Sequence, residues 1–251
     1  EGQDVLRMNE DELRAFRWRK VSFVPQSALN SLCPVLTIGE QISDVIVTHD
    51  RVTKRVARQR IADLLQLVGV DGAREASYPH ELSGGMRQRV AIAIALALHP
   101  PLVVMDEPTT ALDVVVQHEV LSRIAALRDE FGMSILFITH DLSVVANFAT
   151  HIGVLYAGQL VEFGRARDLV RAPRHPYTKG LLNSQLSLHA PRRKLQGIPG
   201  TPPDLRHRPI GCAFRARCPD AVDRCGVETP DLKSAHDVGE ERRAACHLLG
   251  P

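Results

Sequence analysis

This sequence of 251 residues has no long apolar run, few aromatic side chains and almost no net charge. Its longest apolar run, residues 90–98, is far shorter than the roughly 20 residues that span a bilayer, and its first residues show no secretory signal pattern. Aromatic residues make up 4% of the chain, and the formal net charge is +2. We therefore expect neither base-stacking surfaces nor a polybasic coat for nucleic acid.

Charge and proline are distributed unevenly. Residues 1–170 contain 17 basic and 21 acidic residues, a formal charge of −4, whereas residues 171–251 contain 14 basic and 8 acidic residues, a formal charge of +6. Ten of the 16 prolines lie in the second segment. This shift predicts a domain boundary near residue 170, although a solvated, loop-rich tail would give the same composition.

The first segment alternates predicted strands and helices. Short apolar runs predict strands at 21–24, 102–105, 134–139, 152–156 and 159–162, of which 102–105 is expected to be buried on both faces and 134–139 to be buried. Apolar spacing predicts helices at 50–68, 83–98, 114–130 and 141–148. This alternation is typical of a parallel sheet covered by helices, in which ligands bind outside the carboxyl ends of the strands.

Polar residues follow two of these strands. Asp106 and Glu107 come directly after the strand at 102–105, and His140 follows the strand at 134–139. Successive side chains alternate in direction, so one carboxylate can face a metal-bound phosphate and the other a water. Taken alone, an Asp-Glu pair is more often an acidic helix N-terminus, and a lone histidine is more often a core residue. The flanking residues, 102–105 and 108–113, favour the phosphate site.

Glycines open the predicted helix at 83–98. Ser83 is a suitable N-cap, and Gly84 and Gly85 lack the Cβ that would keep a phosphate away from the backbone N–H groups. The positive end of the helix then favours an anion. A Gly-Gly pair is often only a turn, but the full string at 82–89, Leu-Ser-Gly-Gly-Met-Arg-Gln-Arg, is far more specific.

Five motifs, taken in order, resemble those of ABC-transporter ATPase subunits. They are Gln26 (Q-loop), residues 82–88 (signature motif), residues 102–107 (Walker B), Ala111-Leu112-Asp113 (D-loop) and His140 (switch histidine). The resemblance implies an α/β fold, namely a P-loop NTPase-like ABC ATPase domain with a helical subdomain at about 27–100.

Three further strings resemble the oligopeptide/dipeptide importer branch of this family. They are residues 78–82 (Tyr-Pro-His-Glu-Leu), residues 175–182 (His-Pro-Tyr-Thr-Lys-Gly-Leu-Leu) and residues 198–205 (Ile-Pro-Gly-Thr-Pro-Pro-Asp-Leu) before a cysteine cluster. The resemblance covers essentially the whole chain. It implies a Cys-rich C-terminal extension at 171–251 and an ATP-hydrolysing subunit that drives peptide import.

The family mechanism implies roles in ATP hydrolysis for four matching residues. Asp106 would hold the Mg²⁺ shell, and Glu107 would act as general base on the attacking water. His140 would contact the γ-phosphate. Gln26 would sense Mg²⁺ and the γ-phosphate and relay closure to the permease.

The same mechanism implies that the signature motif acts across a dimer. Ser83 and Gly85, with Gly84 and Gln88 of the same motif, would bind ATP held by the opposite subunit, and Asp113 would cross the interface. The opposite subunit would be a second ABC ATPase in a heterodimer. Two transmembrane permease subunits and an extracytoplasmic substrate-binding protein would complete the importer, with this subunit at the cytoplasmic face of the membrane. No nucleic-acid partner is expected.

One motif of the family is missing. Gly-x-x-x-x-Gly-Lys-Ser/Thr, the loop that cradles the phosphates, occurs nowhere in the 251 residues. The family places it upstream of the Q-loop, but only 25 residues precede Gln26, and the chain does not begin with Met. We therefore expect an N-terminally truncated ATPase domain, residues 1–170, that does not bind ATP in its own half-site but still donates its signature motif. A degenerate natural subunit is the alternative.

Four of the five cysteines lie in the C-terminal segment, at Cys212, Cys218, Cys225 and Cys246. Disulfides are rare in cytosolic ATPases. The intervening gaps of 5, 6 and 20 residues do not match the paired spacing of zinc sites. On spacing alone an iron–sulfur cluster, zinc and free thiols all stay open. Some members of the resembled branch carry a 4Fe–4S cluster on such cysteines, and the resemblance implies one here.

Two other functions compete with peptide import. One is a non-transport ABC ATPase acting on nucleic acid or ribosomes, and such proteins usually carry two ATPase cassettes in one chain. The other is a catalytically silent regulatory or cluster-bearing subunit. The missing phosphate loop favours the silent subunit, whereas Glu107 and His140 argue against it.

Overall fold

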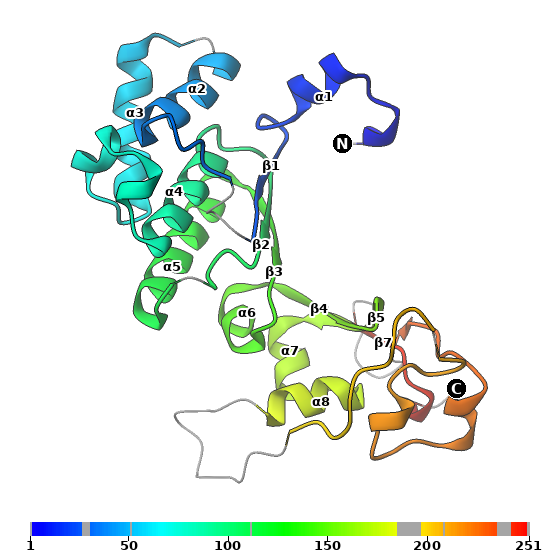
Figure 1. The fold of residues 1–251 in the computed structure, drawn as a ribbon. Coiled ribbons are helices and arrows are strands. Elements are labelled where there is room, and N and C mark those ends of the chain that lie inside the picture. The colour runs from blue at the N-terminus through cyan, green and yellow to red at the C-terminus, as the bar shows by residue number, and fades with distance from the viewer. Residues whose placement is uncertain are drawn as a thin grey trace. The chain divides into compact units, whose positions relative to one another are not determined.

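The computed structural model describes residues 2–26, 31–50, 52–110, 112–184, 197–207, 209–234 and 242–249 (Figure 1). The chain packs as two units, Glu1–His140 and Asp141–Pro251. The compositional boundary expected near residue 170 falls inside the second unit, because strands from both sides of it pair in one sheet. In the described part of the chain, no helix combines the length and the apolar character needed to cross a membrane.

A parallel sheet of three strands lies at the centre of the first unit. Its order is β1 (Val21–Val24), β2 (Leu102–Asp106) and β3 (Ser134–Ile138). Met105 of β2 lies opposite Val24 on one side and Phe137 on the other. The carboxyl ends of the strands therefore meet at one edge, and the predicted parallel sheet is confirmed for these three strands.

The two faces of this sheet are buried to different extents. Val24, Val103 and Met105 are fully buried, and α4 packs against β1. Phe23 and Leu136, which share a register row on the opposite face, are 51% and 54% exposed. The prediction that β2 is buried on both faces and that β3 is buried is therefore wrong in this structure. β3 is an edge strand, and Ile138, on the same face as Leu136, is 46% exposed.

Helices precede and connect the strands of the first unit. They are α1 (Glu10–Phe16), α2 (Ile38–Asp50), α3 (Lys54–Leu67), α4 (Gly84–Leu96) and α5 (Val114–Phe131). The predicted helices at 83–98 and 114–130 correspond to α4 and α5. The helix predicted at 50–68 begins later, because Asp50 ends α2 and Thr53 precedes α3. Figure 1 shows α2 and α3 grouped together beside α4, which gives the first unit its helical part.

The second unit is built on an antiparallel sheet in the order β4-β5-β7-β6. Its strands are β4 (His151–Tyr156), β5 (Gln159–Arg165), β6 (Lys233–Ser234) and β7 (Arg243–Ala244). Its helices are α6 (Leu142–Phe148), α7 (Ala166–Arg171) and α8 (Pro176–Asn183). Ala157 and Gly158, with φ of 50° and 75°, form the two-residue turn between β4 and β5. The strands predicted at 152–156 and 159–162 thus belong to a separate, antiparallel sheet.

Short 3₁₀ helices complete both units. They lie at Val5–Arg7, Gly72–Ala76, Pro79–Glu81, Arg215–Arg217, Asp223–Gly226 and His247–Leu249. In the second unit, Phe214 is 2% exposed and its ring lies 5.2 to 5.8 Å from those of Tyr156, Tyr177 and His175. Phe214 therefore packs against the β4-β5 hairpin and the start of α8, so this part of the C-terminal segment is not fully solvated.

Candidate functional site

Glu107 follows β2 directly and is held by three side chains. Gln26 Nε2 donates to its Oε2 at 3.0 Å, and Thr110 Oγ1 lies 3.2 Å from the same oxygen. His140 Nδ1 lies 3.0 Å from Oε1, and because an ionised carboxylate only accepts, this nitrogen is the donor. Gln26 and His140 come shortly after β1 and β3. The three strand ends thus bring the predicted residues together around one carboxylate.

The surroundings of Glu107 favour its ionised form. The hydrogen bond from His140 contributes most to holding the pKa of Glu107 below its ordinary value, and those from Gln26 and Thr110 act in the same direction. The Glu107 side chain is 20% exposed. Its backbone lies in the left-handed region with φ of 44°, while its N–H donates to the carbonyl of Ile138 at 2.9 Å. Strained backbone of this kind is typical of functional positions.

Asp106 is the last residue of β2. Its side chain forms no hydrogen bond or ion pair with any residue that the structure describes. Carboxylate oxygens are ligands that Mg²⁺ prefers. The residue therefore fits the metal-binding role predicted for it.

Ser83 and Gly84 form the exposed beginning of α4. Met86 N donates to Ser83 Oγ at 3.3 Å, which confirms Ser83 as the N-cap. A Cβ added at Gly84 would meet no atom within 4 Å, so no described residue requires glycine there. The open space is what an approaching ligand needs. Gly85 is half-buried, and Gln88 is 2% exposed and faces the interior, unlike the start of the helix.

Asp113 is the N-cap of α5. Its Oδ1 accepts from Val115 N at 3.1 Å and from Val116 N at 3.0 Å. Val114 and Val115, in the first turn, are 79% and 77% exposed. Asp113 therefore has a local capping role, and its contact with a second subunit stays a prediction. Ala111, in the same motif, lies outside the described residues.

The four C-terminal cysteines belong to the second unit. Cys225 is buried and the other three are half-buried, and Cys212 N donates to the carbonyl of Cys225 at 2.9 Å. Burial raises the pKa of the Cys212, Cys218 and Cys246 thiols, and the charges of neighbouring cysteines raise it further. In the described ranges, no group of three or more His, Cys, Asp or Glu residues is placed to hold a metal ion.

The sequence reasoning missed Thr110. Its hydroxyl lies 3.2 Å from both the carbonyl oxygen and Oε2 of Glu107, and its single proton can serve only one of them at a time. The signal in the sequence is a hydroxyl three residues after a carboxylate in a turn.

A second carboxylate, Glu162 on β5, was also missed. It is fully buried and accepts hydrogen bonds from the backbone N–H groups of Arg174 and His175, both at 2.9 Å. Arg242 Nη2 lies 3.5 Å from Glu162 Oε1. No sequence signal links Glu162 to a partner 80 residues away.

Comparisons with known families agree with the motifs. The profile of the ABC transporter family matches residues 1–110, and that of the oligopeptide/dipeptide transporter C-terminal region matches residues 161–225. The oligopeptide transport ATP-binding protein AppD of Bacillus subtilis is 47% identical over 250 residues, which are 99% of this chain and 75% of that protein. The oligopeptide transport ATP-binding protein OppD of Mycobacterium tuberculosis is 46% identical, over 98% of this chain and 40% of that protein.

A solved structure shares the fold. It is the dimeric, post-hydrolysis state of the ATP-binding cassette MJ0796 bound to ADP and Pi, with a TM-score of 0.60 and 31% identity. The match covers 64% of this chain and 69% of the cassette. The chain therefore belongs to the family of ATP-hydrolysing subunits of oligopeptide and dipeptide ABC importers.

Proposed function

We propose that Glu107 is the general base of ATP hydrolysis in this subunit, with Gln26 and His140 as its catalytic partners. The observation that carries the proposal is the convergence of Gln26 and His140, which follow β1 and β3, and of Thr110 on the carboxylate of Glu107, which follows β2. Hydrolysis needs a base that is ionised at neutral pH, and the lowered pKa of Glu107 meets that need.

The same hydrogen bonds hold the base in a resting state. A carboxylate with a lowered pKa is a weaker base, so it gains basicity when donors leave it. Gln26 and His140 are side-chain donors that can turn from Glu107 towards a γ-phosphate. Asp106 would hold Mg²⁺, which supplies charge neutralisation of the phosphates when it is bound with the nucleotide. Arrival of nucleotide would thereby release Glu107 to take a proton from water.

We infer that this subunit forms a heterodimer with a second ATPase subunit, and that the start of α4 binds the nucleotide held by that second subunit. The exposed Ser83, the open space at Gly84 and the positive end of a 13-residue helix support anion binding there. Gly85 would add a backbone N–H. The buried Gln88 would act by holding the helix, and Asp113 would meet the second subunit beside the exposed Val114 and Val115.

We infer that the subunit works at the cytoplasmic face of a membrane, with two permease subunits and an extracytoplasmic substrate-binding protein. The relatives named for oligopeptide transport support peptides as the imported substrates. Co-purification with both permease subunits tests the assembly. A subunit that purifies without them and with ribosomes would instead favour the non-transport ATPase.

Hydrolysis by the assembled transporter tests the catalytic roles. Replacing Glu107 by Gln in this subunit should abolish its share of the turnover, and replacing His140 by Ala should lower it strongly. A catalytically silent subunit would show no change for either variant. Because the 251 residues contain no phosphate-loop motif, the assay uses the assembled transporter with this subunit in a form that includes one.

We further propose that Cys212, Cys218, Cys225 and Cys246 hold a 4Fe–4S cluster. Burial disfavours the charged form of Cys212, Cys218 and Cys246, and each of these three is within electrostatic range of another of the four cysteines, so a cationic centre would stabilise them. In such a cluster each iron takes one thiolate, so the four sulfurs need not converge on a single ion.

Anaerobic purification tests the cluster. A brown protein that absorbs at about 400 nm and contains iron and sulfide supports it. A colourless preparation with stoichiometric zinc and no iron would refute it. Replacing Cys33 by Ser, outside the cluster, is the matched control and should leave the colour unchanged.

A further inference from the structure

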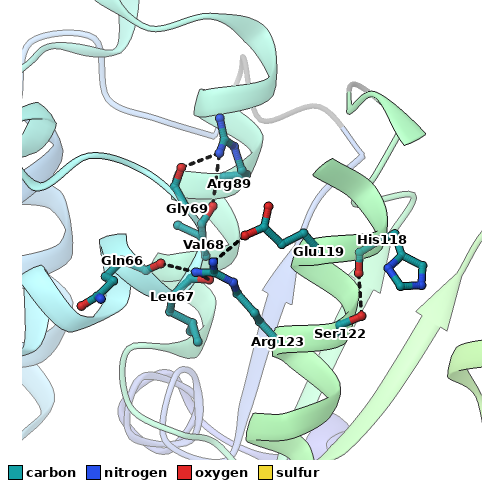
Figure 2. A network of polar contacts seen from close by, with 9 residues as sticks. All are labelled: Gln66, Leu67, Val68, Gly69, Arg89, His118, Glu119, Ser122 and Arg123. Carbon is teal, nitrogen blue, oxygen red and sulfur yellow. Dashed lines mark hydrogen bonds and ion pairs between the residues drawn. The ribbon is translucent and has the colours of Figure 1, made fainter. Parts of the chain in front are cut away.

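Two arginines from different helices hold the C-terminal end of α3 (Figure 2). Four consecutive carbonyl groups, of residues 66–69, point towards them. Arg123 on α5 donates from Nη1 to the first two carbonyls at 2.6 and 3.1 Å. Arg89 on α4 donates from Nη1 to the last two at 3.4 and 2.5 Å. The end of α3 is thus fastened from two sides.

The physical need for these arginines lies in α3 itself. The last carbonyl groups of a helix have no partners inside it, and this end of the helix carries partial negative charge. The last turn of α3 contains no basic residue of its own. Guanidinium groups satisfy several carbonyls at once through charge-assisted hydrogen bonds. Gly69 N also donates to the Gln66 carbonyl at 3.0 Å, and Arg89 and Arg123 supply further donors to this end of α3 from two other helices.

Each arginine also belongs to a helix that carries a motif with a proposed function. Arg89 lies one turn after Gly85, and its Nε is 3.4 Å from the Gly85 carbonyl. Arg123 lies on the helix that Asp113 caps, and its Nη2 donates to Glu119 Oε1 at 2.5 Å. Figure 2 shows Glu119 beside Arg123 on α5. The end of α3 therefore joins the signature helix to the helix that follows the D-loop.

We propose that Arg89 and Arg123 are positioning residues for the signature motif. By fixing α4 and α5 to the end of α3, they present Ser83 and Gly85 to the second subunit's nucleotide in one orientation. The inference rests on the proposed function of the signature motif in that second site. Misplacement of contact groups by about 1 Å lowers rates about a hundredfold in enzymes, so such bracing has a direct effect on hydrolysis.

The test measures hydrolysis of only the nucleotide that this signature motif is proposed to contact. In the assembled transporter, Glu107→Gln in this subunit silences its own catalytic base, so the remaining turnover comes from the second subunit's nucleotide. In that background, Arg89→Ala should lower kcat/KM for ATP about tenfold, and Arg123→Ala somewhat less. The double variant should lose less than the product of the single effects, because both arginines brace one helix end.

Two variants separate positioning from stability alone. Arg89→Lys keeps the charge at the helix end but lacks the planar fork, so it should restore the melting temperature and only part of kcat/KM. Arg58→Ala is the matched control, because Arg58 is an exposed arginine of α3 whose partner is Glu75. It should leave kcat/KM unchanged.

Gly84→Ala distinguishes failure of the positioning role of the arginines from failure of the proposed function of the signature motif. If Gly84→Ala lowers turnover whereas Arg89→Ala and Arg89→Lys change only the melting temperature, the positioning role is overturned and the proposed function stands. If Gly84→Ala also leaves turnover unchanged, the signature motif does not serve the second site, and both proposals fall.

Discussion

Glu107 and Glu162 are both held by several donors, but the donors differ in kind. Glu107 lies at the carboxyl end of β2 with its side chain 20% exposed, and its partners are the side chains of Gln26, Thr110 and His140. Glu162 is fully buried and is held by two backbone N–H groups and Arg242. Side-chain donors can rotate away when a ligand competes for them, whereas backbone donors cannot. The kind of donor, more than the number of hydrogen bonds, distinguishes the proposed catalytic carboxylate from the structural one.

The largest expected effect is on catalysis. Glu107→Gln removes the proposed base and should lower hydrolysis at this subunit's own nucleotide by about 10² to 10⁴-fold. The melting temperature should stay the same, because the partners of Glu107 are exposed and can turn to water. Steady-state turnover and thermal unfolding of the same preparation check both statements. A variant with a much lower melting temperature would mean that Glu107, like Glu162, has a structural role.

The opposite pattern is expected for the buried carboxylate. Glu162→Gln leaves Arg242 buried without a counter-charge and should destabilise the second unit by about 3–5 kcal/mol. Denaturant unfolding measures this loss. Glu228→Gln is the control, because Glu228 pairs with Arg224 at the surface and its loss should not be measurable. Equal stability of the two variants would contradict the comparison.

The pH dependence of the second unit should reveal the buried histidine next to Glu162. Burial lowers the pKa of His175 from 6.5 to about 4, and its Nδ1 accepts from Tyr177 N. The unfolded chain therefore binds a proton more readily than the folded one between these pH values. Stability should be complete above pH 6.5 and fall by up to about 3 kcal/mol as the pH approaches 4.

A histidine replacement provides the control for this pH effect. His175→Asn keeps a side-chain acceptor for the helix N-terminus but does not titrate. Denaturant unfolding at pH 7 and pH 5 should show a smaller pH-dependent loss for the variant than for the native chain. Identical losses would show that other groups cause the effect.

The smallest effect concerns Thr110. Removing its hydroxyl with Thr110→Val should lower turnover about fivefold, the effect of one neutral hydrogen bond on the orientation of Glu107. Thr110→Ser, which retains the hydroxyl, should keep most of the activity. Activity that is equal for Val and Ser would assign Thr110 no part in holding the base.

The residues around Glu107 could be predicted because each follows a recognisable strand or motif. Gln26, Asp106 and His140 stand at strand ends, and a parallel sheet brings such ends together whatever the detailed packing. Thr110 has only a weak signal, a hydroxyl three residues after a carboxylate, and its contact also depends on the left-handed backbone at Glu107. The backbone angle itself cannot be read from the residue type, so the spacing alone does not establish the contact.

Long-range packing explains the other differences. The pairing of Glu162 with Arg242 joins residues 80 positions apart, and only the formed sheet β5-β7 brings them together. The helix α2 was missed although Ile38, Ile42 and Ile46 recur at helical spacing and are fully buried. The exposure of β3 depends on which elements cover the sheet, which the composition of one strand does not specify.

The backbone at Glu107 has a consequence for how this protein could be altered. A left-handed residue with a Cβ is strained, and glycine or asparagine adopts that conformation more readily. Screening variants for heat resistance alone should therefore favour Glu107→Gly or Glu107→Asn, both of which lack the base. Screening for hydrolysis should retain Glu107 despite its strain. At this one position, selection for thermal stability and selection for ATP hydrolysis favour different amino acids.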